Sequence, residues 1–216
     1  MSWYHAAGAL GSTLPDLIRW DRASRDKTLI SSSTSAMMHA PARLNDGTIY
    51  PYGMGIGLGE YHGIRCTHHA GGVGGFVSQM RCLYDPEITI IVLANLRTTP
   101  FDKLTRAIAR MVPALAEQIS EPAPPPKSTL TADLNECLGT FRHEGGAILN
   151  VRRHDNSVAV EWPGMPVRQL VASSTNSFYE HDDSEVLWTF SDHRAGSWHR
   201  LTHHVPSWPS LTYQRG

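Results

Sequence analysis

The stretch RCTHHAGGVGGFVSQMRCLYDPEITIIVLA, residues 65–94, decides the fold of the first half of the chain. It holds three strand-like runs, residues 65–69, 76–84 and 88–94, and the last two are separated only by Asp85-Pro86-Glu87. Because short turns join neighbouring strands in antiparallel fashion, we expect an antiparallel sheet. In this prediction a strand ends at His69, and a glycine-rich segment follows it.

A further strand is predicted just upstream, over residues 50–59 (YPYGMGIGLG). Glycine alternates there with apolar residues, and such alternation favours a strand with one bare face for a close neighbour. A turn at His62-Gly63 would pair this strand with residues 65–69.

Helices are predicted on both sides of these strands. Thr13, Pro15 and Asp16 form a typical helix start, with a hydroxyl cap, a proline in the first turn and an acid near the positive end. A second short helix is expected over residues 33–39, ending before Pro41. A third is expected over residues 101–119, with one apolar side. That side comprises Leu104, Ile108, Met111, Val112, Leu115 and Ile119. The fold class is therefore α+β.

A proline-rich segment, residues 121–127 (EPAPPPK), divides the chain. Successive prolines favour extended backbone and exclude helix, so we expect a linker between a domain of residues 1–120 and another of residues 128–216. The second domain has short strand-like runs separated by turn residues, which predict a small antiparallel barrel, lipocalin-like, or a sandwich. The runs are residues 147–153, 157–162, 167–171, 186–190 and 198–202. Its tryptophans are expected in the core, with a ligand platform as the alternative.

Composition excludes several classes of protein. With 41% hydrophobic and 18% charged residues the chain is globular, and a formal net charge of −1 gives no reason to expect a nucleic-acid partner. No apolar run approaches the roughly 20 residues of a membrane span, and the start lacks the features of a secretory signal, which slightly favours the cytoplasm over the periplasm. The three cysteines are expected to be free, and neither they nor the histidines show metal-binding spacing, so we expect no metal and no cofactor.

The segment from His69 to Phe76 (HAGGVGGF) has the composition of a reactive site. Glycines allow unusual backbone angles and let a substrate approach backbone N–H donors, which could bind an oxyanion in acyl transfer. From composition alone, a glycine-rich hairpin with an incidental histidine is the favoured explanation of the segment.

Residues 1–120 also resemble the C-terminal part of the serine β-lactamase and penicillin-recognising hydrolase domain. The resemblance extends to D-aminopeptidases and D-alanyl-D-alanine carboxypeptidase-like enzymes, which use His-x-Gly in place of Lys-Thr-Gly and have a following β-barrel. The matching segments are Ala7-Gly8-Ala9-Leu10-Gly11-Ser12-Thr13-x-x-Asp16-Leu17, Tyr52-Gly53-Met54-Gly55, His69-x-Gly71-Gly72-x-x-Gly75-Phe76, Asp85-Pro86 and Ile91-Val92-Leu93-Ala94-Asn95.

The resemblance implies roles for individual residues. His69 would line the cleft and orient the proton-transfer network, and the N–H of Gly72 would be half of the oxyanion hole. Gly71 would keep the strand bare where the substrate lies, with Ala70 and Tyr52 beside it. Substrates would be D-amino-acid peptides, amides, esters or β-lactams, attacked by a serine within Ser-x-x-Lys.

The sequence departs from the family at the nucleophile. Ser-x-x-Lys belongs well upstream of the matched segments, and the literal match Ser24-Arg25-Asp26-Lys27 falls after the first expected helix; Ser174-Thr175-Asn176 falls in the second domain. We therefore expect part of a serine hydrolase, inactive alone, whose partner is a missing N-terminal half or a second copy. The alternative is a non-catalytic remnant that acts as a binding module.

Overall fold

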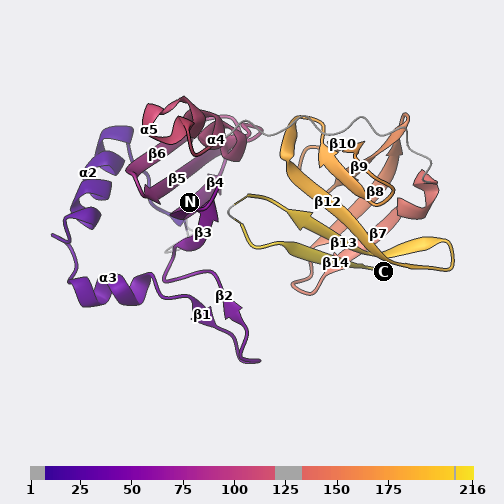
Figure 1. The fold of residues 1–216 in the computed structure, drawn as a ribbon, viewed down its shortest axis with the longest axis horizontal. Coiled ribbons are helices and arrows are strands. Elements are labelled where there is room, and N and C mark those ends of the chain that lie inside the picture. Colours follow the sequence, from indigo (N-terminus) through magenta and orange to yellow (C-terminus); the bar gives the residue numbers. More distant parts are fainter. Residues whose placement is uncertain (1–7, 120–132, 207) are drawn as a thin grey trace. The chain divides into compact units, whose positions relative to one another are not determined.

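The computed structural model describes residues 8–119, 133–206 and 208–216 (Figure 1). The chain separates into two compact units, residues 1–120 and 121–216, which are described separately. The expected linker, residues 121–127, and Ala7 lie outside the described residues.

The first unit is built on a four-stranded antiparallel sheet in the order β3-β4-β5-β6. Its strands are β3 (Gly57–Tyr61), β4 (Ile64–Val73), β5 (Phe76–Tyr84) and β6 (Glu87–Ala94), so the expected antiparallel sheet is confirmed. The expectation that a strand ends at His69 is wrong, because β4 continues to Val73. The chain reverses only at Gly74 and Gly75, whose φ angles of 54° and 95° suit a two-residue hairpin turn.

The expectation of a single strand over residues 50–59 is also wrong. Strand β2 (Ile49–Tyr50) pairs with β1 (Ala42–Arg43), and an irregular segment separates it from β3. Gly53 lies against the preceding helix so closely that a Cβ there would be 2.0 Å from the carbonyl oxygen of Met38. The glycines thus serve close approach, as expected, but at a bend rather than along a strand.

Two helices precede the sheet. Helix α2 (Leu14–Arg25) begins as expected, because the Thr13 side chain accepts a hydrogen bond from the N–H of Asp16 at 3.3 Å. Helix α3 (Ser32–Met38) is capped by Ser31. The helix expected over residues 101–119 is broken into α4 (Phe101–Met111) and α5 (Pro113–Ala116), because Pro113 cannot continue the hydrogen-bond ladder.

Helix α4 is turned differently from the expectation. Its buried residues are Thr105, Arg106 and Ala109, whereas Met111, expected to be buried, is 80% exposed. Leu104 and Ile108 are each 39% exposed, although Leu115 and Ile119 are buried as expected. The cause lies in the sheet: Arg81 of β5 is fully buried beneath the helix and pairs with Asp102 at 3.5 Å, which draws the polar side of α4 inward. Burial lowers the pKa of the Arg81 guanidinium.

The second unit is a closed antiparallel barrel of eight strands, so the barrel, not the sandwich, is the architecture. Around the barrel the order is β10-β11-β12-β13-β14-β7-β8-β9. The strands are β7 (Gly139–His143), β8 (Ile148–His154), β9 (Ser157–Glu161), β10 (Arg168–Ala172), β11 (Ser177–Glu180), β12 (Asp183–Arg194), β13 (Ser197–His204) and β14 (Leu211–Arg215), preceded by the 3₁₀ helix η1 (Leu134–Cys137). Five of them match the predicted runs, and β7, β11 and β14 were not predicted.

Large side chains fill the barrel. Trp188, Phe141, Phe178 and Phe190 are fully buried, and aliphatic residues complete the cluster. Of the tryptophans expected in the core, Trp188 is buried, while Trp162 and Trp198 pack against the cluster from its edge. The interior is therefore a packed core.

The cysteines are free, as expected, and burial raises the pKa of Cys137 to about 12. Within the described residues, no helix is long and apolar enough to cross a bilayer.

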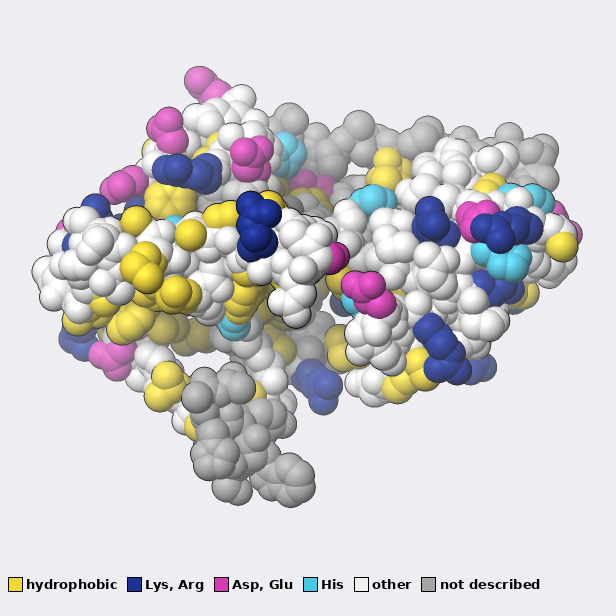
Figure 2. Space-filling model, turned by 90° about the horizontal axis from the view of Figure 1, so that it is seen from below, with side chains coloured by type: hydrophobic (Ala, Val, Ile, Leu, Met, Phe, Trp, Pro, Cys, Tyr) yellow, Lys and Arg dark blue, Asp and Glu magenta, His cyan; other side chains and the backbone are white. Residues whose placement is uncertain are grey.

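The first unit leaves much apolar surface uncovered. Helix α2 buries none of its residues, and Trp20 on it is 57% exposed. On the sheet, Phe76 of β5 and Leu93 of β6 are 64% and 44% exposed. Figure 2 shows hydrophobic side chains gathered over the surface of this unit, which is on the left in that view. Exposed apolar side chains in this number are typical of an interaction surface.

We predict that the chain alone will self-associate, because burying this surface in a second copy removes it from water. Sedimentation velocity at several concentrations, together with the fluorescence of an apolar dye, measures this directly. A monodisperse monomer that binds no dye would contradict the prediction.

Candidate functional site

The site is built around His69 on β4 and Tyr52 in the segment before β3. Nε2 of His69 lies 2.8 Å from the Tyr52 hydroxyl, and the two rings are tilted by 59°. The hydrogen bond joins an exposed imidazole to a phenol, a pair able to hold or pass a proton at the surface of the sheet. The structure thus brings together two of the residues that the sequence selected.

Backbone contacts fix Tyr52 in place. Its carbonyl oxygen accepts a hydrogen bond from the N–H of Ala42, and it forms a bridge with Gly57 at the start of β3. The N–H of Met54 donates to the carbonyl of Met38 at 3.0 Å. The segment that contains Tyr52 is thus hydrogen-bonded to the end of α3 and to the start of β3, which fixes its position.

The segment that carries the candidate residues is a sheet edge. Strand β3 pairs with β4 only as far as His68, whereas β5 pairs with β4 as far as Val73. Within the described residues, β4 therefore has no strand partner on the β3 side from His69 to Val73. Backbone N–H and C=O groups on such an edge can accept an extended ligand as an added strand.

Strand alternation divides the candidate residues between the two faces of the sheet. His69 and Gly71 share one face, while His68, Ala70 and Gly72 face the side of α4. Ala70 stands opposite the buried Gln79, so only its backbone can serve a site on the His69 face. A Cβ at Gly72 would meet nothing within 4 Å, which leaves that backbone open.

The side chain of Ser78, which was not predicted as a site residue, lies where a side chain at Gly71 would be. A Cβ at Gly71 would lie 2.6 Å from Oγ of Ser78, which stands opposite it on β5. The space above Gly71 is therefore occupied by a hydroxyl, where the sequence analysis expected bare strand. The turn at Gly74-Gly75 fixes this pairing and could have revealed Ser78 from the sequence.

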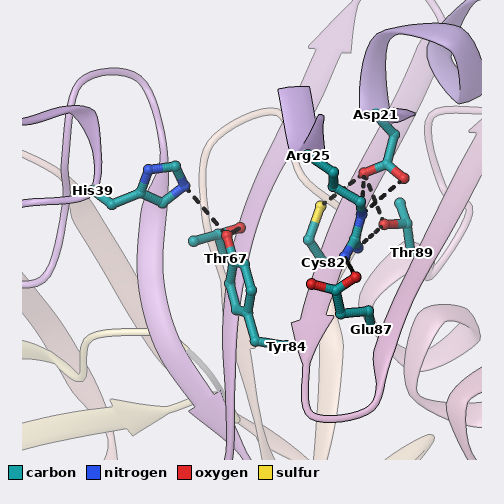
Figure 3. A network of polar contacts seen from close by, with 8 residues as sticks. All are labelled: Asp21, Arg25, His39, Thr67, Cys82, Tyr84, Glu87 and Thr89. Carbon is teal, nitrogen blue, oxygen red and sulfur yellow. Dashed lines mark hydrogen bonds and ion pairs between the residues drawn. The ribbon is translucent and has the colours of Figure 1, made fainter. Parts of the chain in front are cut away.

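At its other end, the same face of the sheet is tied to helices by a polar network (Figure 3). The Asp21 carboxylate of α2 pairs with Arg25 at 3.1 Å and accepts hydrogen bonds from Thr89 and the Cys82 thiol. Beside this group, Tyr84 bridges Thr67 and Nε2 of His39, which follows α3. Since Nδ1 of His39 bonds the Ser35 carbonyl, Nε2 accepts from Tyr84.

Burial raises the pKa values of the Cys82 thiol and the Tyr84 hydroxyl, so both groups stay neutral. The network therefore anchors α2 and α3 over one end of the sheet. Ser24 of the literal Ser-x-x-Lys match lies in the last turn of α2, next to Arg25, and Arg25 bonds Thr89 beside the β5–β6 turn. It is thus held near the end of the sheet remote from Gly72.

A second buried polar cluster lies in the barrel. The Glu180 carboxylate accepts hydrogen bonds from Arg168 at 2.7 Å and Trp188 at 3.3 Å. His203 stacks on Trp188 with 3.9 Å between ring centroids, and burial lowers its pKa to about 3. Glu180 and Trp188 are buried, whereas the Arg168 side chain is 44% exposed. In the Ser174-Thr175-Asn176 segment, the Asn176 side-chain amide donates a hydrogen bond to the carbonyl oxygen of Phe190. Within the described residues, no group of His, Cys, Asp and Glu is placed to hold a metal ion.

Comparison with known proteins gives distant relatives. The chain is similar to penicillin-binding protein 4* of Bacillus subtilis (strain 168), with 26% identity over 196 residues, which cover 88% of this chain and 44% of that protein. It is also similar to the D-aminopeptidases of Gluconobacter oxydans (24% identity; 59% of this chain, 23% of that protein) and Brucella anthropi (32% identity; 44% and 18%). The chain thus spans less than half the length of these relatives. No family model matches it.

The likenesses to solved structures are weaker. The octameric penicillin-binding protein homologue from Pyrococcus abyssi superposes with a TM-score of 0.46 at 15% identity, over 94% of this chain and 47% of that one. The structure described as SurE gives a TM-score of 0.44 at 20% identity, over 92% and 45%.

Replacing Tyr52 by Phe should release the His69 ring, because the phenol oxygen is removed while the ring is kept. Two-bond ¹H–¹⁵N spectra of the histidine side chains report the tautomer and environment of His69. We expect its signals to shift in Tyr52→Phe and to stay unchanged in the control Tyr50→Phe. Unchanged His69 signals in Tyr52→Phe would mean that the hydrogen bond is absent in solution.

Proposed function

We propose that this chain forms one wall of the active site of a serine hydrolase related to penicillin-binding proteins and D-aminopeptidases. The observation that carries the proposal is the His69–Tyr52 pair beside a glycine-rich stretch of β4, which has no strand partner among the described residues on its β3 side. The distant relatives support the proposal, because a penicillin-binding protein and a D-aminopeptidase are similar to 88% and 59% of this chain.

In this proposal the backbone does most of the binding. The substrate lies along β4 between His69 and Val73, where none of the described strands pairs with β4 on the β3 side. The N–H of Gly72 points its partial positive charge at the carbonyl oxygen that becomes an oxyanion. Removing one such donor typically costs about 10²–10³ in rate.

In this proposal, His69 and Tyr52 take part in proton transfer. Their hydrogen bond holds the imidazole in one orientation, and a positioned acid or base of this kind contributes roughly 10²–10⁴ in rate. The attacking serine and its lysine belong to a separate N-terminal portion. That serine is acylated by the substrate, which is a D-amino-acid peptide, amide, ester or β-lactam. No covalent step is assigned to a residue of this chain.

The partner of the chain is then that N-terminal portion. The polar network anchors α2 and α3 at one end of the sheet, whereas Phe76 and Leu93 at the other end are exposed. A second body that covers these side chains would bury apolar surface, which stabilises association by about 25 cal/mol per Å² of apolar area. It would also place its serine opposite His69.

The test is labelling with a fluorescent penicillin and a fluorophosphonate. We expect the chain alone to remain unlabelled, and a segment encoded directly upstream of Met1, supplied as a second polypeptide, to be labelled on the serine of a Ser-x-x-Lys. In this mixture His69→Ala should slow acylation by roughly 100-fold, while Ser24→Ala should have no effect.

Labelling of the chain alone, lost in Ser24→Ala, would overturn the division of roles. An upstream frame without Ser-x-x-Lys, or a mixture that stays unlabelled, would overturn the hydrolase proposal and leave the binding module as the better account.

A further inference from the structure

Ser78 is the residue on this face whose hydroxyl has no evident structural task. It is the third residue of β5, in register with Gly71 on one side and Leu93 on the other. Its side chain makes no hydrogen bond to any described residue, yet it is half-buried.

The hydroxyl is held over the candidate substrate path. Oγ fills the place that a Cβ of Gly71 would take, so it stands directly above the backbone of the glycine motif. His69 precedes Gly71 by two residues on β4. Its side chain therefore points to the same face as Ser78, because side chains alternate along a strand. The Ser78 hydroxyl therefore lies on the same face of the sheet as the His69–Tyr52 pair.

The surroundings of Ser78 are apolar. Phe76, two residues earlier on the same face of β5, is 64% exposed, and Leu93 beside it is 44% exposed. A hydroxyl between these side chains is a single directional donor in a hydrophobic setting, where a hydrogen bond discriminates most strongly.

We propose that Ser78 is a substrate-binding residue, which donates a hydrogen bond from its hydroxyl to a carbonyl or carboxylate oxygen of a ligand lying along β4. The ligand would be a short D-amino-acid peptide, with the carbonyl on Ser78 and an apolar side chain toward Leu93. The proposal rests on the proposed function for the choice of ligand, and it adds a binding residue that lies outside the glycine motif.

The experiment is a titration of the isotope-labelled chain with D-alanyl-D-alanine, followed by the amide signals of Gly71, Gly72 and Ser78. Because one hydrogen bond is lost, Ser78→Ala should raise the Kd roughly 2- to 13-fold. Ser78→Thr keeps the hydroxyl and should retain most of the affinity. Gly71→Ala should weaken binding as well, because the new methyl displaces the hydroxyl without removing it.

Ser191 on β12 is the matched control, since it is a half-buried strand serine in the other unit, and Ser191→Ala should bind as the unchanged chain does. The proposal is overturned when the unchanged chain shows no shifts, or when Ser78→Ala binds equally well. Thermal unfolding of each variant separates loss of binding from loss of fold.

This titration needs no acylation, so its outcome is independent of the labelling experiment. Binding that depends on Ser78, together with a mixture that stays unlabelled, would support the role of Ser78 and refute the hydrolase. Labelling without dependence on Ser78 would do the reverse.

Discussion

The candidate site depends on the difference in length between two paired strands. Strand β4 has ten residues and its neighbour β3 has five, so the glycine-rich end of β4 projects beyond the pairing. The hairpin turn at Gly74-Gly75 fixes the register of β4 with β5 on the other side, because a two-residue turn with both φ angles positive allows only one pairing. From this one constraint follow the free strand edge, the common face of His69 and Gly71, and the place of Ser78.

The two faces of the same sheet differ in how far the described helices cover them. Helices α4 and α5 cover one face with buried Ala109 and Leu115, and the fully buried Arg81 lies beneath them. On the opposite face, the Asp21–Arg25 and Tyr84–His39 contacts hold α2 and α3 at one end only. The candidate residues lie on the rest of this face, which no described helix covers.

Local signals in the sequence were sufficient for many features. The cap at Thr13, the strands β5 and β6, and five barrel strands follow from hydrogen-bonding chemistry and alternation, both of which act over a few residues. The orientation of α4 could not be predicted in this way, because a partner from another strand, Arg81 with its need for Asp102, outweighs the apolar stripe of Leu104 and Ile108. Nor could the contact of Tyr52 with His69, since it depends on how residues 51–56 bend back against Met38. Ser78 was within reach, because the hairpin register alone places it opposite Gly71.

The central claim is that the projecting end of β4 and the face beside it are covered by a second portion of a hydrolase. Hydrogen–deuterium exchange of the chain, measured with and without the polypeptide encoded upstream, tests this claim most directly. The account predicts slower exchange in residues 69–78 when the two are mixed, with the barrel unchanged. Exchange in residues 69–78 that stays as fast in the mixture as in the chain alone would contradict it.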